Sequence, residues 1–130
     1  VEKAYRFDMS RGLPFEDNLT DIIISDLSLH YFTKEKTSKI LQEIKRVLKP
    51  NGLLIFRVNS VKDVNHLAGQ GTEIEHHLYK TNDGRYKRFF DEEDINRFFS
   101  DWKSLYIHEE IMGRYGMDKV LWRCAMQVKK

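Results

Sequence analysis

The sequence predicts an α/β fold in which a mostly parallel sheet is the middle of three layers and an antiparallel strand pair closes the sheet. Two short apolar runs, Ile22–Ile24 and Leu53–Phe56, are typical of strands that are covered on both faces. The segment between them has apolar residues at helical spacing. A strand, a helix and a second strand in this order form one right-handed crossover unit. Segments 105–112 and 120–128 provide the antiparallel pair.

Length and composition limit the possible classes of protein. The 130 residues are expected to form one domain, which is long enough for a core but short for a complete doubly wound fold. The net charge of +2 is too small to indicate a nucleic-acid partner. The single cysteine, Cys124, cannot form an intrachain disulfide, so a cytoplasmic location is the default. No apolar run reaches the roughly 18 residues that a transmembrane helix requires, and no membrane partner is predicted.

The first predicted element is a short strand over Ala4–Met9 that ends near Asp8, because aromatic and polar side chains alternate weakly there. A loop rich in turn-forming residues, 10–18, returns the chain to the strand that contains Ile22. In parallel sheets, ligands bind beyond the carboxyl ends of the strands. The residues that leave the Ile22 strand, Ser25–Tyr31, are therefore the predicted site.

A helix is predicted over about Lys34–Leu48. Thr33 is a suitable N-cap, Glu35 lies in the first turn and basic residues lie near the other end, as the helix dipole favours. The predicted apolar stripe consists of Ile40, Leu41, Ile44, Val47 and Leu48. Pro50 and Gly52 are expected to end the helix, because proline cannot continue it and glycine accepts a positive φ. A second buried strand, over residues 53–59, follows at once.

The segment 60–90 is less regular and is expected to cover the site. Its aromatic residues either line an apolar acceptor pocket or pack beneath the cover, and both interpretations stay open. They are Tyr79, Tyr86, Phe89 and Phe90. Asp91 predicts the N-cap of a short helix, with Asp94 three residues later and an apolar stripe at 95, 98 and 99. Residues 113–118 are predicted to be the hairpin loop between the last two strands.

The segment Glu73–His77 contains residue types that bind metals, since carboxylates and imidazoles are good ligands. Adjacent histidines, however, point to opposite faces of a strand and rarely share one ion. The sequence therefore predicts no metal site, and a solvated segment near the cover is the favoured interpretation. Cys124 lies in an apolar strand and is predicted to be an inert core residue.

In the order of its motifs, the chain resembles the second half of class I S-adenosylmethionine-dependent methyltransferases. The residues that carry the resemblance are Asp8, Leu13-Pro14-Phe15-Glu16-Asp17, Asp21 to His30 and Glu43 to Gly52, with Asn51 replacing a glycine of the family's segment. Each motif is weak by itself, but their order and spacing are fairly specific. The resemblance covers nearly all 130 residues. It implies a partial Rossmann-like methyltransferase sheet in a single domain, 1–130, that is the carboxyl-terminal half of the fold.

Two features of the family are missing from the sequence: the Gly-rich turn after its first strand and the acidic residue that ends its second strand. Residues 68–71, Ala-Gly-Gln-Gly, do not replace the turn, because no buried strand precedes them. The resemblance therefore implies that the isolated chain is inactive. It also implies an unpaired edge on the Ile22 strand, which is central in the complete fold. Self-association that covers this edge and gives a homo-oligomer is expected, either through the Ile22 strand or through a displaced Ala4–Met9 strand.

The resemblance implies S-adenosylmethionine as the cofactor and gives roles to five residues. Asp8 would accept a hydrogen bond from the adenine amino group and Met9 would border the ring. Ser25, Asp26 and Leu27 would border the methionine portion and the transferred methyl group. Each role has a structural alternative: Asp8 as a solvated residue at a strand end, and Ser25 with Asp26 as caps of the loop turn.

Methyl transfer requires little proton chemistry, because the sulfonium is already a good leaving group and catalysis is mainly positioning. Asp26 and His30 are the candidate catalytic residues. Histidine titrates near neutrality and can remove a proton from an oxygen or nitrogen nucleophile, although packing or capping is the competing role of His30. A small-molecule acceptor is expected. The alternative function is a non-catalytic binding or assembly module that reuses the half-fold.

Overall fold

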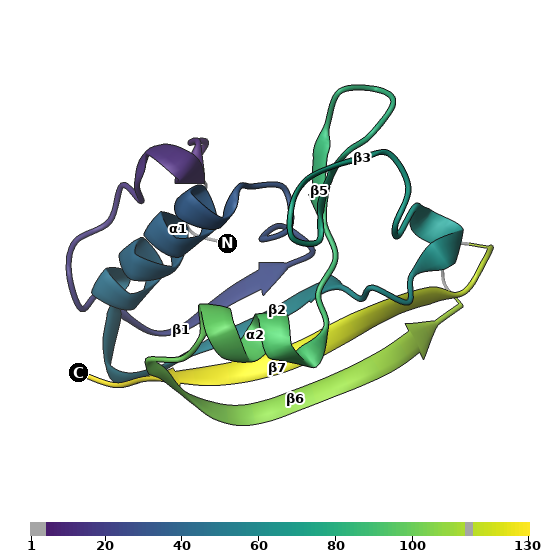
Figure 1. Ribbon diagram of the computed structural model, residues 1–130. Coiled ribbons are helices and arrows are strands. Elements are labelled where there is room, and N and C mark those ends of the chain that lie inside the picture. The colour runs from purple at the N-terminus through teal and green to yellow at the C-terminus, as the bar shows by residue number, and fades with distance from the viewer. Residues whose placement is uncertain (1–4, 114–115) are drawn as a thin grey trace.

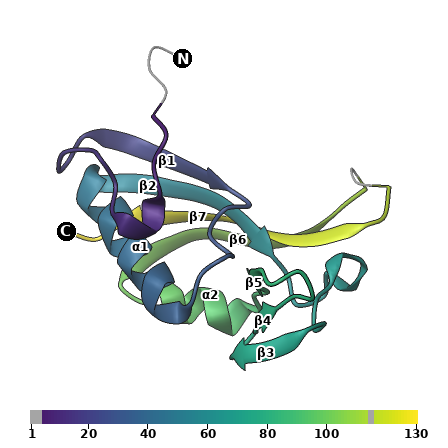
Figure 2. The ribbon, with the colours of Figure 1, turned by 90° about the horizontal axis from the view of Figure 1, so that it is seen from above.

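The computed structural model describes residues 5–113 and 116–130, which form a mixed α/β fold (Figures 1 and 2). The main sheet has the strand order β1-β2-β7-β6. Its strands are β1 (Thr20–Asp26), β2 (Leu48–Asn59), β6 (Trp102–Met112) and β7 (Lys119–Val128). Helices α1 (Lys34–Val47) and α2 (Glu92–Phe98) both lie on one face of this sheet (Figure 1). The predicted α/β class is confirmed.

The predicted crossover unit is present. β1 and β2 are parallel, with Ile22–Asp26 opposite Leu53–Arg57, and α1 connects them. Both strands therefore end at the same edge of the sheet. The helix begins as predicted, because Thr33 Oγ1 accepts a hydrogen bond from the Lys36 N–H at 3.3 Å. Within the described chain, no helix has the length and apolar character needed to span a membrane.

The segment that follows α1 differs from the prediction in two respects. β2 already begins at Leu48, so Leu48 belongs to the strand and not to the helix, and residues 50–52 lie within β2. Asn51 adopts the positive φ, at 64°, whereas Gly52 does not. Gly52 is needed for space instead. A Cβ at this position would lie 2.8 Å from the Lys49 carbonyl oxygen and 3.1 Å from the Asp21 carbonyl oxygen. The close approach of this part of β2 to β1 therefore explains the glycine.

The closing antiparallel pair and the second helix are confirmed. β7 is antiparallel to β2, and β6 is antiparallel to β7 at one edge of the sheet. Asp91 caps α2 in a reciprocal arrangement: its side chain accepts from the Asp94 N–H at 2.7 Å, and the Asp94 side chain accepts from the Asp91 N–H at 2.9 Å. Part of the predicted hairpin loop, residues 114–115, lies outside the described residues.

The predicted strand over Ala4–Met9 is wrong for its described part, and Ala4 lies outside the described residues. Residues 5–8 form no strand, and Met9–Arg11 form the 3₁₀ helix η1. The cause is Asp8, whose side chain accepts a hydrogen bond from the Ser10 N–H at 3.0 Å. This local bond turns the chain and competes with an extended conformation.

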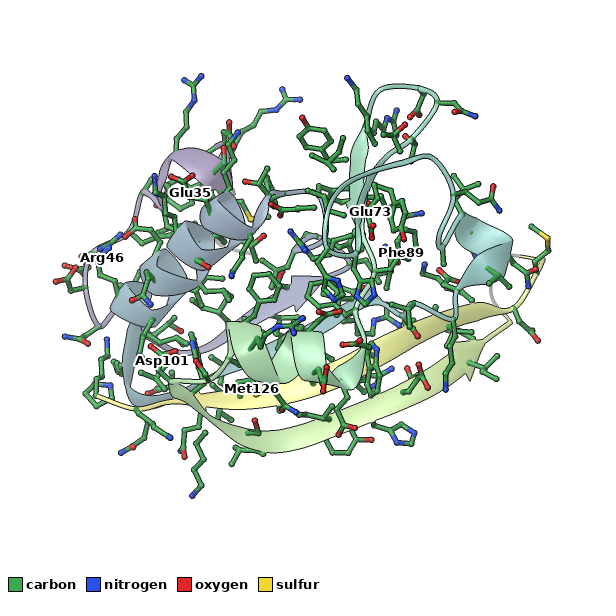
Figure 3. All side chains as sticks on the ribbon, viewed as in Figure 1. Glu35, Arg46, Glu73, Phe89, Asp101 and Met126 are labelled. Atoms are coloured by element: carbon green, nitrogen blue, oxygen red, sulfur yellow. The ribbon has the colours of Figure 1, made fainter. Side chains whose placement is uncertain are left out.

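The hydrophobic core lies between the main sheet and the two helices, where the side chains of Figure 3 crowd together. Cys124 belongs to it, as predicted, and burial raises the pKa of its thiol to about 12. On β1, however, Ile22 and Ile24 are 50% and 72% exposed. The prediction that this strand is covered on both faces is therefore wrong for the described residues, because α1 and α2 cover the same face of the sheet.

The segment predicted to be irregular forms a small antiparallel sheet of order β3-β4-β5, after the 3₁₀ helix η2 (Val64–His66). Its strands are β3 (Thr72–Glu75), β4 (Leu78–Lys80) and β5 (Tyr86–Arg88). The Arg88 N–H donates to the His30 carbonyl oxygen at 2.7 Å, so this sheet adjoins the loop after β1. Phe89 and Phe90 are buried, which supports the packing role for these two residues.

His76 and His77 form the turn between β3 and β4. His77 has a positive φ of 61°, and the two rings stack with centroids 3.8 Å apart. The expectation that the adjacent side chains point to opposite faces of a strand is therefore wrong, because strand alternation does not apply within a turn.

We predict that Gly52→Ala destabilises the protein, because the added methyl group overlaps the backbone of β1 and of the first residues of β2. The expected loss in the free energy of unfolding is about 1–3 kcal/mol, measured by urea denaturation. Gly113→Ala is the matched control, because its Cβ would meet nothing nearer than the Asp118 Oδ1 at 3.8 Å. Equal stability of the two variants would contradict the steric explanation.

Candidate functional site

The carboxyl end of β1 is fixed to β2 by an ion pair. Arg57 donates to both carboxylate oxygens of Asp26, with Nη2 2.7 Å from Oδ2 and Nε bonded to Oδ1. The Leu27 N–H donates to the Arg57 carbonyl oxygen at 3.0 Å, and Leu27 itself has a positive φ of 54°. Asp26 thus links the two strand ends. Its catalytic role stays a prediction.

The loop after β1 divides the predicted site residues between two cavities. The first, of about 340 Å³, lies between the N-terminal segment, β1 and α1, and Met9, Ser25 and Asp26 line it. The second, of about 180 Å³, is lined by Leu27 and His30. The structure therefore brings three of the predicted residues together and separates two others from them.

Asp8 lies next to Met9 at the start of η1 and keeps its carboxylate partly exposed. Its Oδ1 accepts hydrogen bonds from the Ser10 N–H at 3.0 Å and the Ser10 hydroxyl at 2.6 Å. These bonds, with the nearby Arg11 guanidinium as a smaller cause, hold the pKa of Asp8 below its ordinary value. Asp8 is therefore an ionised hydrogen-bond acceptor near neutral pH. Its binding to adenine stays a prediction.

Two residues of α1 fix the N-terminal segment beside the site. Arg46 donates to the Phe15 carbonyl oxygen at 2.8 Å, to Asp17 Oδ1 at 2.8 Å and to the Leu13 carbonyl oxygen at 3.0 Å. Glu43 accepts from the Leu13 N–H at 3.1 Å and binds the Arg46 guanidinium at 2.8 Å. Two of the sequence motifs that carried the family resemblance are thus joined by direct hydrogen bonds.

His30 is almost fully buried, with an exposed fraction of 2%. Burial lowers the pKa of its imidazole to about 3, and the positive charges of Lys119 and Lys87 contribute. The expectation that His30 titrates near neutrality is therefore wrong. Its Nδ1 is buried and has no hydrogen-bond partner within residues 5–113 and 116–130. This setting favours a packing role, while a catalytic role stays untested.

The second cavity contains polar residues that sequence reasoning missed. Lys119 Nζ donates to Asn59 Oδ1 and Asp63 Oδ2, both at 2.7 Å, and all three residues are buried. Burial by itself raises the pKa of Asp63, but hydrogen bonds from Lys119 and from the Val120 N–H more than offset it, so the pKa is lowered. Burial and the charge of Lys119 lower the pKa of Lys87. Of these residues, only Asn59 could have been recognised from the sequence as a site candidate, because it is a polar residue at the end of a buried strand.

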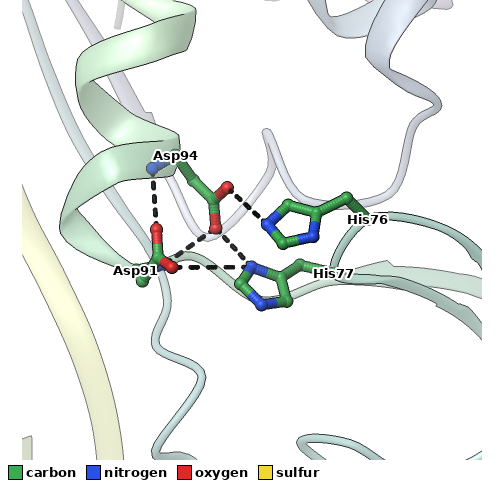
Figure 4. A group of neighbouring side chains, drawn as sticks. All are labelled: His76, His77, Asp91 and Asp94. Carbon is green, nitrogen blue, oxygen red and sulfur yellow. Dashed lines mark hydrogen bonds and ion pairs between the residues drawn. The ribbon is translucent and has the colours of Figure 1, made fainter.

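Four side chains among the described residues form a group whose atoms are close enough to hold a metal ion (Figure 4). They are His76, His77, Asp91 and Asp94, and their ligand atoms all lie within 4.8 Å of one another. The group lies outside the two cavities, at the junction of the β3–β4 turn and the start of α2.

Comparison with known proteins gives a family match and several relatives. The model of the methyltransferase domain family matches residues 3–56. The tRNA N(3)-methylcytidine methyltransferase Mettl2 of Drosophila melanogaster is 34% identical over 84 residues, which are 64% of this chain and 26% of that protein. Malonyl-[acyl-carrier protein] O-methyltransferase 1 of Coxiella burnetii is 34% identical over 75 residues, 55% of this chain and 26% of that protein. The chain thus spans about a quarter of the length of these curated relatives.

Solved structures show the same fold at low identity. A SAM-dependent methyltransferase from Methanosarcina mazei superimposes with a TM-score of 0.79 at 17% identity, covering 95% of this chain and 65% of that one. The 1,6-didemethyltoxoflavin-N1-methyltransferase of Burkholderia thailandensis, solved with bound 1,6-didemethyltoxoflavin and S-adenosylhomocysteine, gives a TM-score of 0.69 at 14% identity, covering 94% of this chain and 48% of that one.

We predict that His30 stays neutral from pH 8 down to pH 5, because its pKa is about 3 in the folded protein against an ordinary value of 6.5. The unfolded chain binds this proton first, so the contribution of His30 to stability is complete above pH 6.5 and is lost as the pH falls towards 3. Nitrogen NMR shifts of the ring measure its protonation directly. A titration midpoint above pH 5 would contradict the buried, neutral ring.

Proposed function

Because the chain belongs to the class I S-adenosylmethionine-dependent methyltransferase family, we propose that it is the carboxyl-terminal half of an enzyme that methylates a small molecule. The family's cofactor is S-adenosylmethionine, whose sulfonium makes the methyl group transferable. The observation that carries the proposal is the meeting of Met9, Ser25 and Asp26 at one cavity beside the end of β1. The chain spans about a quarter of its curated relatives, so the residues that complete the cofactor site would come from the rest of the fold.

The residues around this cavity fit the adenosine part of the cofactor. Phe7, Met9 and Leu13 provide apolar surface for a purine ring, and the hydroxyls of Ser25 and Ser28, 2.6 Å apart, provide polar groups nearby. The Asp8 carboxylate, next to Met9, is an acceptor suited to an exocyclic amino group. These residues would bind and orient the donor, which is the main requirement of methyl transfer.

The acceptor in this proposal is a small molecule that reaches the donor from the second cavity, on the other side of the loop after β1. Leu27 lines the second cavity, while its neighbour Asp26 lines the first. The volume of the second cavity, about 180 Å³, suits a compact chemical group rather than a helix of nucleic acid. The second candidate acceptor is tRNA, which is favoured by the name of the Drosophila melanogaster relative. A non-catalytic assembly module is the remaining alternative.

The free, buried thiol of Cys124 is in keeping with the cytoplasm as the proposed location.

We predict that the 130-residue chain alone does not bind S-adenosylmethionine at micromolar concentration, whereas a longer protein that joins it to the amino-terminal half of the family's fold does. In that longer protein, Asp8→Asn should keep the cap of η1 and weaken binding by about tenfold to a hundredfold, as expected for one charged hydrogen bond. Calorimetry measures both effects.

Asp83→Asn is the matched control, because Asp83 is another exposed aspartate that accepts local hydrogen bonds, from Thr81 and the Arg85 N–H. Equal effects of the two substitutions would count against adenine binding by Asp8. Micromolar binding by the 130-residue chain would refute the proposal that this chain holds only half of the cofactor site. Incubation of the longer protein with methyl-labelled S-adenosylmethionine and a cell extract then distinguishes the candidate acceptors. Label in the low-mass fraction supports the small molecule, ribonuclease-sensitive label supports tRNA, and no label at all supports the assembly module.

For the 130-residue chain by itself, we propose self-association through the edge of β1. This strand pairs only with β2 among the described residues, and it carries the exposed Ile22 and Ile24. An unpaired edge beside apolar side chains is a template for pairing with a second copy.

Sedimentation velocity at micromolar concentration is therefore expected to detect a dimer. Ile24→Lys should shift the chain to the monomer, because a charged side chain at an edge opposes pairing. The matched control is Val64→Lys, which changes an equally apolar, 62% exposed residue on η2. A folded wild-type monomer would contradict the proposal.

A further inference from the structure

We propose that His76, His77, Asp91 and Asp94 form a binding site for a first-row divalent metal ion of the zinc class. The four residues come from two elements that are separate in the sequence, the β3–β4 turn and the beginning of α2 (Figure 4). His77 Nδ1 lies 2.5 Å from Asp94 Oδ2, and His76 Nε2 lies 3.4 Å from Asp94 Oδ1. His77 Nδ1 is also 4.0 Å from Asp91 Oδ2. Both imidazoles thus contact the carboxylate of Asp94, and the carboxylate of Asp91 lies next to them.

The ligand set suits zinc and its neighbours. Imidazole nitrogen and carboxylate oxygen bind Zn²⁺ at about 2.0–2.2 Å, and a tetrahedral ion separates its ligand atoms by roughly 3.4 Å. The four ligand atoms lie within 4.8 Å of one another. Side-chain rotations that move these atoms by about one ångström would therefore bring them to bonding distance from a common ion. A site with two nitrogen and two oxygen ligands is less suited to Ca²⁺ or Mg²⁺, which prefer oxygen ligands alone.

The surroundings hold these ligands in position. The Asp91 N–H donates to Asp94 Oδ2 at 2.9 Å, and Arg97 binds the other oxygen of Asp94. The His77 N–H donates to Glu73 Oε2 at 3.3 Å. Hydrogen bonds of this kind orient the ligands of metal sites and are usually needed for affinity. The histidine rings stack at an interplanar angle of 29°, so both present a nitrogen to the same carboxylate.

The site also has an access route. His76 and Asp94 line an open groove of about 850 Å³ between α1, α2 and the small sheet. The His76 side chain is 62% exposed, whereas that of Asp94 is 4% exposed, so the ion would approach from the side of His76 and be held by a buried carboxylate. A bound ion would replace the direct contacts between histidine and aspartate by coordinate bonds and would link the small sheet to α2.

The experiment is a titration of the 130-residue chain with Zn²⁺ by calorimetry and with Co²⁺ by visible absorption. The expected result is one ion per chain and the d–d bands of four-coordinate Co²⁺, which Zn²⁺ then removes. His76→Gln should weaken Zn²⁺ binding at least tenfold to a hundredfold, on the order of the loss seen when a metal site is disturbed. Because His76 is exposed, this substitution leaves the core intact.

His108→Gln is the matched control, since it removes an exposed histidine of β6 outside the group and should leave the affinity unchanged. The proposal is overturned if Co²⁺ gives no d–d bands, or if both variants bind Zn²⁺ as the wild type does; direct hydrogen bonds alone would then explain the group. Neither readout depends on methyl transfer, so the result is independent of the proposed function.

Discussion

The contact of Arg46 with the N-terminal segment is the interaction on which the site depends. Residues 5–8 have no strand partner in the described chain, so β-sheet pairing does not position Asp8 or Met9. The Arg46 guanidinium instead binds the loop that follows them at two carbonyl oxygens and the Asp17 carboxylate. The hydrogen bonds that Arg46 donates to Glu43 and Asp17 raise the pKa of Arg46 further above an already high value. The guanidinium therefore keeps its charge throughout the range of pH in which proteins fold.

This arrangement explains why the resemblance was carried by motifs that are distant in the sequence. The Leu13–Asp17 loop and the Glu43–Arg46 segment are the two sides of one contact, and β1 and β2 are fixed to each other at the next contact, Asp26 with Arg57. Together these ion pairs join the N-terminal segment, α1 and the two parallel strands. The loop after β1 then has a fixed position between the two cavities.

Features that depend on neighbouring residues were predicted well from the sequence. The caps at Thr33 and Asp91 and the apolar stripe of α1 are properties of a few adjacent residues, and they are confirmed. The errors arose where distant or unusual contacts decide the outcome. His30 is buried because β5, more than fifty residues later, covers it, as the bond from Arg88 shows. His77 leaves the strand pattern through a positive φ that no local signal announces. Lys119 reaches the second cavity only through the pairing of β7 with β2.

The burial of Cys124 has a practical consequence for spectroscopy. Thiol-reactive labels attack the thiolate, and a buried thiol whose pKa is about 12 forms almost none at neutral pH. Because the native chain has one cysteine, two cysteines introduced on the surface would be the only sites that react quickly. Paired spin or fluorescence probes on the small sheet and α2 would then report the movement of one against the other, without any change to the native core.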